Sequence, residues 1–223
     1  MQRGAARAAV FGVSDGLITN VSLILGVAGA SPGSSFVRLA GLAGLLAGAF
    51  SMGAGEYISM RAQTELLDRE LRIEEHALSA HPDAEQAELV TIYQRRGLPR
   101  PLAERVAAAL MRDPEQALET HAREELGIRP GQLGSPPAAA VWSFVSFSIG
   151  ALIPLVPWFF IQGSGAVLAS MVAGAIAALA VGAAIGAAAD RPRVPSALRQ
   201  LTIAALAAGM TFLVGHIIGV NAA

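Results

Sequence analysis

Two carboxylic acids interrupt stretches of this chain that are otherwise apolar enough to lie in lipid. Asp15 lies in the first apolar run of the sequence, and Glu56 lies in the second. A charge at the centre of a bilayer costs roughly 2.5–3.5 kcal/mol on insertion scales, so such residues usually face a pathway or a partner. Met52 and Met60 each stand four residues from Glu56. Carboxylate and thioether groups on one helix face indicate a path for a transition metal.

The acids also have structural interpretations. Asp15, Thr19 and Ser22 fall at i, i+4 and i+7, so a helix would carry them as one polar stripe. Asp15 could instead cap a helix break or pair with Arg7, and the methionines could simply fill space. Space filling is the favoured interpretation for the methionines alone. For two acids within apolar spans, a functional role is favoured.

Glutamate and histidine side chains recur at helical spacing in the charged middle of the chain. The groups on shared helix faces are Glu70, Glu74 and His81; Glu85 and Glu88; and His121 and Glu125, with Glu124 beside them. Such groups can converge on a divalent cation if their helices form a bundle. Acidic runs interleaved with arginine are more often solvated helix faces with i, i+4 ion pairs, and spacing alone favours that interpretation.

Five apolar stretches are long enough to cross the ~30 Å hydrocarbon core, which takes about 20 residues of helix. They cover residues 8–30, 39–60, 138–161, 165–189 and 201–221. With 53% hydrophobic residues and a mean hydropathy of +0.52, the chain is too apolar for an ordinary soluble domain. We therefore expect an all-α, polytopic membrane protein with five transmembrane helices.

A charged insert separates the second and third of these helices. It holds 14 of the 17 acidic residues and 10 of the 16 basic residues. We therefore expect three parts: residues 1–60 with transmembrane helices 1 and 2, residues 61–137 as a helical cytoplasmic domain, and residues 138–223 with transmembrane helices 3 to 5.

Start and stop signals divide the insert into helices. The second transmembrane helix meets no breaker and is expected to continue to about residue 80. Asp83 has the position of a capping-box residue for a helix near 84–96. Pro99 opens the next helix, and Asp113 opens the last one, which Gly127 is expected to end.

The apolar spans also contain small residues, prolines and one histidine that bear on helix packing, helix breaks and proton transfer. GxxxG patterns, which let helix backbones approach, begin at Gly44, Gly182 and Gly215. Packing within one chain is favoured over a subunit interface for each of them. Pro154 and Pro157 predict a kink or break in the third span. His216 could carry a proton in the last span, although a packed, neutral histidine is expected.

Arginines orient the chain in the membrane, because short cytoplasmic segments are enriched in them. The arginines of the N-terminus and of the 190–200 loop lie on one side, whereas the 162–164 turn and the C-terminal tail have none. The N-terminus and the insert are therefore expected to be cytoplasmic and the C-terminus outside. Asp15 disfavours a cleavable signal peptide over residues 1–30. Without a targeting segment, a bacterial-type inner membrane is our expectation.

Four segments resemble the vacuolar iron transporter family, which is related to the nodulin-21-like proteins. They are DGLITNVSLILGVAGA (15–30), AGAFSMGAGEYISMRAQTELLDRE (47–70), THAREELGI (120–128) and SFSIGALIPLVPW (146–158). The resemblance implies a five-span homodimer that moves Fe²⁺, and often Mn²⁺, out of the cytosol in exchange for protons. It also implies a metal path between the subunits, lined by a first-span Asp and a second-span Met. Those positions correspond to Asp15 and Met52, and the glutamate of the family's SMxxGEY segment corresponds to Glu56.

The resemblance further implies that the insert collects metal. The family's ligand positions correspond to Glu74, Glu85, Glu88 and Glu125. This chain has Ala77 where the family can have another glutamate, and His121 where the family can have a methionine. Imidazole is a good ligand for Fe²⁺, Co²⁺ or Zn²⁺, so we retain His121 in the predicted metal set.

The sequence therefore predicts a transporter that exports Fe²⁺ and Mn²⁺ from the cytosol by proton antiport. The expected partners are metal ions, protons, the bilayer and a second copy of the chain, with no organic cofactor and no nucleic acid. The alternative is a membrane-anchored metal buffer or sensor, in which the insert binds metal and the membrane helices only dimerise. The intramembrane acids argue against that alternative, since an anchor gains nothing from their cost. No nucleophile–base pair or HExxH helix supports an enzyme.

Overall fold

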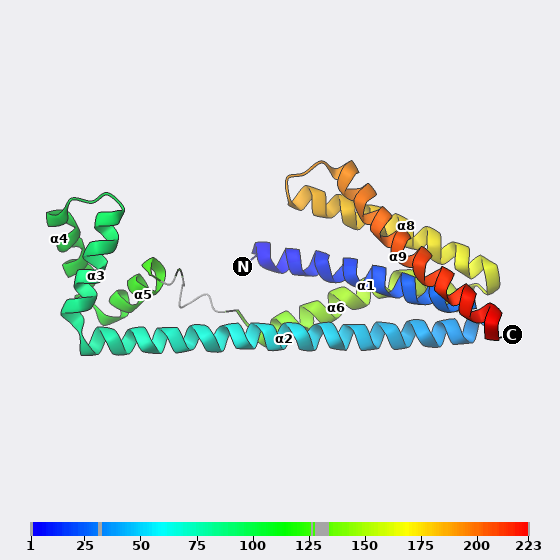
Figure 1. The fold of residues 1–223 in the computed structure, drawn as a ribbon, viewed down its shortest axis with the longest axis horizontal. Helices are drawn as coiled ribbons and strands as arrows, with labels where there is room; N and C mark the ends of the chain where they lie inside the picture. The colour runs from blue at the N-terminus through cyan, green and yellow to red at the C-terminus, as the bar shows by residue number, and fades with distance from the viewer. Residues whose placement is uncertain (1, 31–32, 126, 128–133, 223) are drawn as a thin grey trace. The chain divides into compact units, whose positions relative to one another are not determined.

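The described residues form helices joined by short turns and loops, with no strand among them, which confirms the all-α prediction (Figure 1). The computed structural model describes residues 2–30, 33–125, 127 and 134–222, and the side chains of these except 2–9 and 220–222. The chain divides into two compact units. One contains Met1–Tyr57 and Pro136–Ala223, which we call the bundle, and the other contains Ile58–Ser135, which we call the insert from here on. Each unit is described by itself.

Five described helices are long and apolar enough to cross a membrane, as predicted. They are α1 (Gln2–Ala30), α2 (Ser34–Ala80), α6 (Pro136–Leu155), α8 (Gly163–Ala188) and α9 (Arg193–Ala222). The continuation of the second helix to residue 80 is also confirmed, because α2 runs for 47 residues without a break. No Gly or Pro lies between residues 56 and 80 to interrupt it.

The third span is broken where its prolines predict. A single residue, Val156, separates α6 from the short α7 (Pro157–Phe160), because proline has no N–H to continue the helical ladder. The indole Nε1–H of Trp158 donates to Ser170 Oγ at 2.7 Å, and the Ser170 hydroxyl donates to the Pro154 carbonyl. These buried hydrogen bonds to Ser170 therefore attach the broken segment of the third span to α8.

Glycine pairs bring helix backbones together within the bundle, as expected for packing inside one chain. A Cβ atom on Gly215 of α9 would overlap the carbonyl of Gly26 in α1. A Cβ on Gly182 of α8 would overlap the backbone beside Ala197 in α9. Both contacts need a residue without a side chain, so these motifs are used in intramolecular packing.

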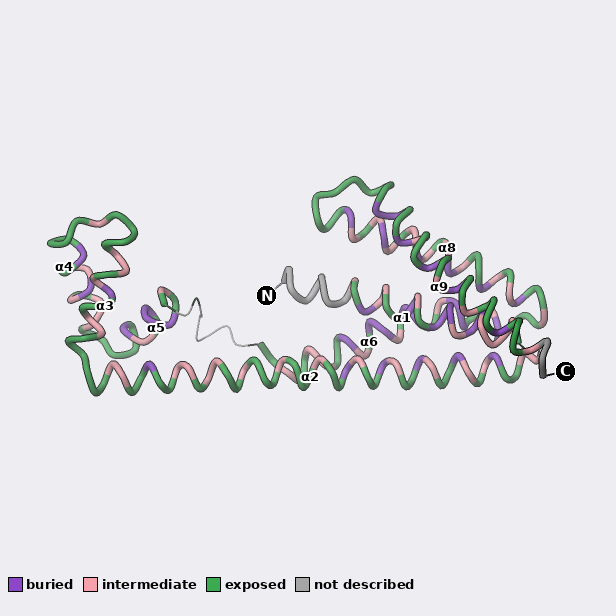
Figure 2. Tube along the Cα trace, in the orientation of Figure 1, coloured by how far each residue is buried: buried purple, intermediate pink, exposed green. Residues whose placement is uncertain are grey.

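The apolar core of the bundle gathers where α1 and α6 meet the first half of α2 (Figure 2). Ile24, Leu45, Phe147 and Leu155 are among its buried members. His216 lies outside this core with an exposed side chain, so the expectation of a packed histidine is wrong for the single chain. The last turns of α9 present that residue outward rather than toward α1.

Three short helices follow α2 in the insert. They are α3 (Pro82–Arg95), α4 (Arg100–Leu110) and α5 (Pro114–Glu124). The predicted capping box at Asp83 is wrong, because α3 begins earlier and Asp83 lies in its first turn. Asp113 does cap α5, since its carboxylate accepts the backbone N–H of Glu115 at 3.0 Å. Residues 128–137 are rich in glycine and proline, as expected for a linker, and 128–133 of them lie outside the described residues.

Apolar packing in the insert is thin. The buried apolar residues described there are Leu89, Ala103, Ala107, Ala117 and Ala122. Leu89 is the one large side chain in that set, and the remaining buried positions of the described insert are polar: Glu74, Thr120 and His121. The insert therefore gains less from apolar burial than the bundle does.

Candidate metal centre

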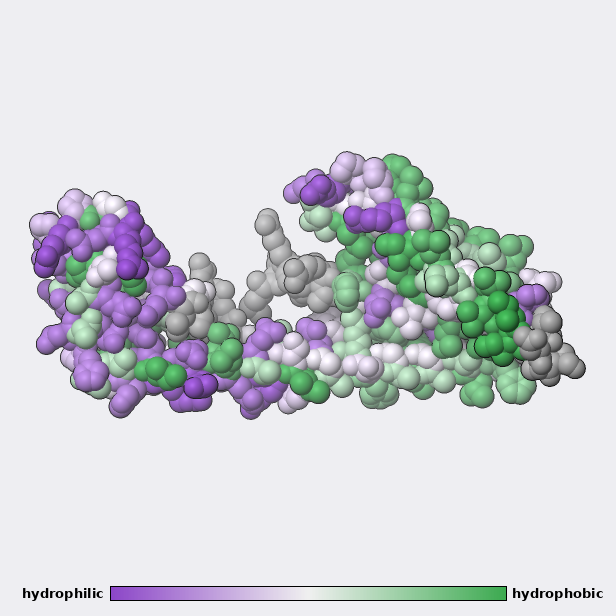
Figure 3. All heavy atoms as spheres, viewed as in Figure 1, coloured by the Kyte–Doolittle hydropathy of each residue, from purple (hydrophilic) through white to green (hydrophobic). Residues whose placement is uncertain are grey.

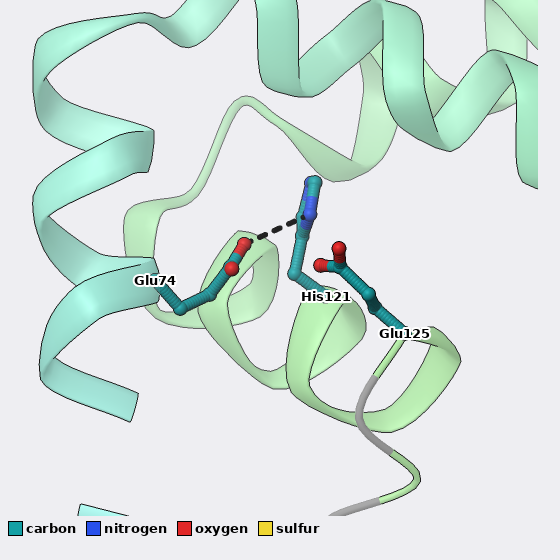
Figure 4. A group of neighbouring side chains, drawn as sticks. All are labelled: Glu74, His121 and Glu125. Carbon is teal, nitrogen blue, oxygen red and sulfur yellow. Dashed lines mark ion pairs between the residues drawn. The ribbon is translucent and has the colours of Figure 1, made fainter. Parts of the chain in front are cut away.

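Three helices of the insert bring together all five residues that the sequence predicts there as metal ligands. Glu74 comes from α2, Glu85 and Glu88 come from α3, and His121 and Glu125 come from the end of α5. Figure 4 shows Glu74, His121 and Glu125 pointing toward one another, and their ligand atoms lie within 4.8 Å of each other. Glu85 Oε2 lies 3.7 Å from His121 Nδ1, and Glu88 hydrogen-bonds to Glu125.

Local structure explains why these side chains converge. Glu85 and Glu88 are one turn apart on α3, so both face the same side of that helix. His121 and Glu125 are one turn apart at the end of α5, where the backbone N–H of Glu125 donates to the His121 carbonyl at 2.9 Å. Glu74 supplies the opposite wall from α2 (Figure 4).

Two members of the group are buried without hydrogen-bond partners. Glu74 is 8% exposed and His121 is fully buried. The carboxylate Oε1 of Glu74 lies 3.0 Å from His121 Nδ1, yet neither atom has a hydrogen bond among the described residues, nor does Nε2 of His121. A buried polar atom left unpaired costs about 1–3 kcal/mol. Such atoms facing one another fit a site that a cation fills.

Burial and mutual repulsion favour protonation of the carboxyl groups of the site. Burial, followed by the charges of Glu125, Glu85 and Glu88, raises the pKa of Glu74 to about 7. Burial and the neighbouring Glu88 also raise the pKa of Glu125. Burial lowers the pKa of His121 despite the opposing influence of Glu85, so its imidazole is neutral and free to act as a ligand. An entering cation therefore has a carboxyl proton to displace near neutral pH.

The donor set is four carboxylates and one imidazole. Oxygen and imidazole ligands suit Fe²⁺, Mn²⁺, Co²⁺ and Zn²⁺. Ala77, at the position where a further glutamate was considered, contributes no ligand. Glu70 and His81, which share a predicted helix face with Glu74, do not join the group, and His81 is exposed beyond the end of α2.

The polar stripe predicted on α1 is divided in the bundle. Asp15 and Thr19 are exposed on the outer face of α1, whereas Ser22 is buried. Thr211 of α9 donates its hydroxyl to the Ser22 carbonyl at 2.7 Å, so α9 packs against α1 at that level. The single chain therefore leaves Asp15 at its surface within a membrane-spanning helix.

The second-helix residues lie close to the level of Asp15. Met52 is half-buried in the bundle, and its methyl group lies beside Gly12, one turn before Asp15 in α1. Glu56 is half-buried one turn further along α2, and Met60 follows it by another turn. Asp15, Met52 and Glu56 thus occupy successive levels toward the end of the bundle at which the insert begins.

Sequence reasoning did not identify two buried amides in the bundle. Asn20 donates its Nδ2–H to the Ala151 carbonyl at 2.6 Å and so joins α1 to α6. Gln200 donates to Ser14 Oγ at 2.5 Å and joins α9 to α1. The position of Asn20 inside an apolar run is the signal that could have marked it as an interhelical contact, whereas Gln200 lies just before the last run.

These features define a class of protein: a helical, polytopic membrane protein whose charged insert carries a candidate cation site. A family model described as the VIT family matches residues 6–216. The chain therefore belongs to the VIT family, and the resemblance seen in its sequence is confirmed.

Several relatives extend over most of the chain. It is 34% identical over 204 residues to vacuolar iron transporter 1 of Eucalyptus grandis, covering 91% of this chain and 82% of that protein. It is 31% identical over 210 residues to vacuolar iron transporter 1 of Arabidopsis thaliana, covering 94% and 84%. It is 35% identical over 184 residues to a vacuolar iron transporter of Acanthamoeba castellanii, covering 82% and 67%.

Proposed function

We propose that this protein transports divalent transition metals across a membrane, with Fe²⁺ and Mn²⁺ as its substrates. The observation that carries the proposal is the convergence of three acids on the buried Glu74 and His121, whose facing atoms have no hydrogen-bond partner among the described residues. The three acids are Glu85, Glu88 and Glu125. The names of its relatives as vacuolar iron transporters support the choice of iron. In this proposal residues 61–137 form a cytoplasmic metal-binding domain that captures the ion.

Three residues of the bundle line the proposed route. Glu56, Met52 and Asp15 lie at successive levels of α2 and α1, with the carboxylates supplying hard ligands and Met52 a thioether. A cation leaving the insert would meet Glu56 first and Asp15 last. An acid in a spanning segment costs free energy, and that cost is offset if its carboxylate replaces water ligands that a passing ion loses.

Protons supply the driving force in this proposal. A carboxylate can hold a metal ion or a proton, and protonation weakens the ligand set and releases the ion. Glu74, with a pKa raised to about 7, is already a site of such competition. Metal leaving the cytosol would be exchanged for protons entering it.

A homodimer completes the route. Asp15 and Thr19 are exposed on the outer face of α1, where contact with lipid would be costly for the acid. A second copy facing the first across a two-fold axis would cover this face and double the set to two carboxylates and two thioethers. The arginines at 191 and 193 would lie on the cytoplasmic side with the N-terminus and the insert, in a bacterial-type inner membrane.

A non-transporting metal buffer or sensor is the second candidate. One observation favours it: the five ligands all belong to the insert, so the candidate site needs no residue of the bundle. A buffer would bind metal as the transporter does and would show no flux.

Reconstitution separates these two functions. Purified protein in liposomes with an internal metal-sensitive dye should pass Fe²⁺ and Mn²⁺ when a pH gradient is imposed, and should pass much less without the gradient. Protein-free liposomes and Mg²⁺ serve as controls. Metal binding in detergent without flux under any gradient would favour the buffer, and absence of both would overturn the two candidates together.

A further inference from the structure

The end of α3 is held in a fixed conformation. Gly97 has a φ of 95°, a left-handed conformation that favours glycine, and its N–H donates to the Gln94 carbonyl at 2.9 Å. The N–H of Leu98 donates to the Tyr93 carbonyl at 3.1 Å. This pair of bonds is a Schellman motif, and it fixes the backbone of Arg96, the residue just before the glycine.

Arg96 reaches from this cap to another helix. Its Nη1 pairs with Oε2 of Glu124, the last residue of α5, with side chains 52% and 12% exposed. The other ion pairs of the described chain either belong to the candidate metal centre or stay within one helix. Arg96–Glu124 is thus, among the described residues, the one ion pair that joins two helices outside the metal centre.

Glu124 stands at a critical position in α5. It precedes Glu125 and follows His121 by three residues, so its backbone belongs to the turn that carries two of the five candidate ligands. Glu88 of α3 hydrogen-bonds to Glu125. Arg96 and Glu88 therefore both connect α3 to that single turn of α5.

Without a bound cation, the side chains of the metal centre provide little attraction to hold the His121–Glu125 turn in place. Beyond the effect of burial, the charges of Glu85 and Glu88 raise the pKa of both Glu74 and Glu125, which is the sign of repulsion within the group. Apolar packing in the insert is also limited, as described above. A stabilising contact made by residues outside the ligand set is needed to keep the acids together before the cation binds.

We propose that Arg96, acting through Glu124, is the positioning residue that holds the His121–Glu125 turn against α3 and so preorganises the metal centre. The pairing also occupies Glu124, which keeps that carboxylate out of the ligand set. This inference rests on the proposed capture of metal by the insert, and it assigns a role to residues that touch no metal.

A positioning role and a simple charge effect predict opposite changes in cation affinity for Arg96→Ala. If Arg96 only lowered the negative potential of the site, then Arg96→Ala would strengthen cation binding and Glu124→Gln would weaken it. If the pair positions α5, both substitutions weaken binding, and combining them adds little to either alone. The two explanations are therefore separable by the direction of one variant.

The test is a Co²⁺ titration of the full-length protein in detergent at fixed ionic strength, followed by the visible absorption of bound Co²⁺. Arg96→Ala and Glu124→Gln should each weaken binding about fivefold, the upper range for a partly exposed ion pair. Arg96→Lys should restore part of the loss, and the exchange of Arg96→Glu with Glu124→Arg should restore most of it. Arg100→Ala, which breaks an exposed pair within α4, is the matched control and should leave binding unchanged.

Several outcomes would overturn the inference. Arg96→Ala that binds Co²⁺ as tightly as wild type, or more tightly, excludes positioning, and so does failure of both the lysine variant and the charge exchange to rescue. If wild type binds no Co²⁺, this inference and metal capture by the insert both fail. If binding follows the expected pattern while liposomes show no flux, only the transport proposal fails.

Discussion

The bundle and the insert are both helical, yet opposite kinds of residue determine their packing. Helices of the bundle approach at glycines, where a side chain would overlap a neighbouring backbone. Helices of the insert meet at acids, whose charges oppose one another. Figure 3 shows the same contrast on the visible surface, mainly hydrophobic over the bundle and mainly hydrophilic over the insert. The bundle can therefore assemble without ions, whereas the insert has an arrangement that a cation would complete.

Buried polar groups follow this division. The amides of Asn20 and Gln200 in the bundle each donate a hydrogen bond to another helix. In the insert, both ring nitrogens of His121 lack a hydrogen bond within the described chain. A paired buried group stabilises a fold, and an unpaired one is expected where a ligand binds.

The largest expected effect separates the units by function. Asp15→Ala should abolish metal flux in liposomes, because it removes the carboxylate proposed for the route. It should leave Co²⁺ binding by the insert unchanged, and Met52→Ala should reduce flux less completely, since a thioether is the weaker ligand. Thr19→Val, on the same outer face, is the control. Unchanged flux in a folded Asp15→Ala protein would remove Asp15 from the route.

A packing variant should affect the bundle alone. A Cβ on Gly150 of α6 would overlap the Val13 carbonyl in α1, so Gly150→Ala should destabilise the bundle by about 3 kcal/mol. Gly209 of α9 has open space around its Cβ position, and Gly209→Ala should instead stabilise its helix by about 0.5 kcal/mol. Thermal unfolding in detergent, with Co²⁺ titration beside it, measures both. Equal melting of the two variants would contradict the proposed dependence on missing side chains.

Ligand variants should affect the insert alone. His121→Ala and Glu74→Gln should each weaken Co²⁺ binding at least about tenfold, because each removes a donor from the buried centre. The bundle should melt as in wild type. Glu119→Gln, an exposed acid on the same helix as His121, should bind normally. If all three variants bind alike, the acids of the insert form a solvated surface rather than a site.

The smallest expected effect is a pH dependence of binding. Glu74 has a pKa of about 7 in the folded protein against an ordinary value of 4.5, so its carboxyl is mostly ionised at pH 8 and mostly protonated at pH 6. Apparent Co²⁺ affinity should be flat above pH 8 and fall about tenfold per unit below pH 7, where one proton must be displaced. Burial also lowers the pKa of His121, which favours its neutral, ligating imidazole. Titrations from pH 6 to 8.5 test this, and Glu74→Gln should flatten the slope.

Much of the fold could be predicted because apolar runs of sufficient length become helices in lipid. The five spans, the long α2 and the break near Val156 all follow from local sequence. The cap of α3 could not be placed so well, since proline at its first position moved the start ahead of Asp83. The environment of His216 was also missed, because periodicity alone does not say which face of α9 contacts α1.

The candidate site, like the fold, could be predicted from the sequence only in part. Spacing put Glu85 with Glu88, and His121 with Glu125, on shared faces, but only the resemblance selected Glu74 over Glu70 and His81 as their companion. No local pattern links Arg96 to Glu124, since the pair joins helices 28 positions apart in the sequence. Contacts of that kind depend on how short helices cross, which the sequence of each helix does not specify.

The break in the third span has a consequence for biogenesis. When this span first leaves the ribosome, α8 has not been synthesised, and the Pro154 carbonyl and the Trp158 indole lack the Ser170 hydroxyl that later satisfies both. In the hydrocarbon, a carbonyl and an indole N–H without a hydrogen-bond partner are costly, so full insertion of the third span is favoured only once α8 is present. The third and fourth spans should therefore enter the bilayer together as a helical hairpin, and Ser170→Ala should slow membrane integration of the third span more than that of the first.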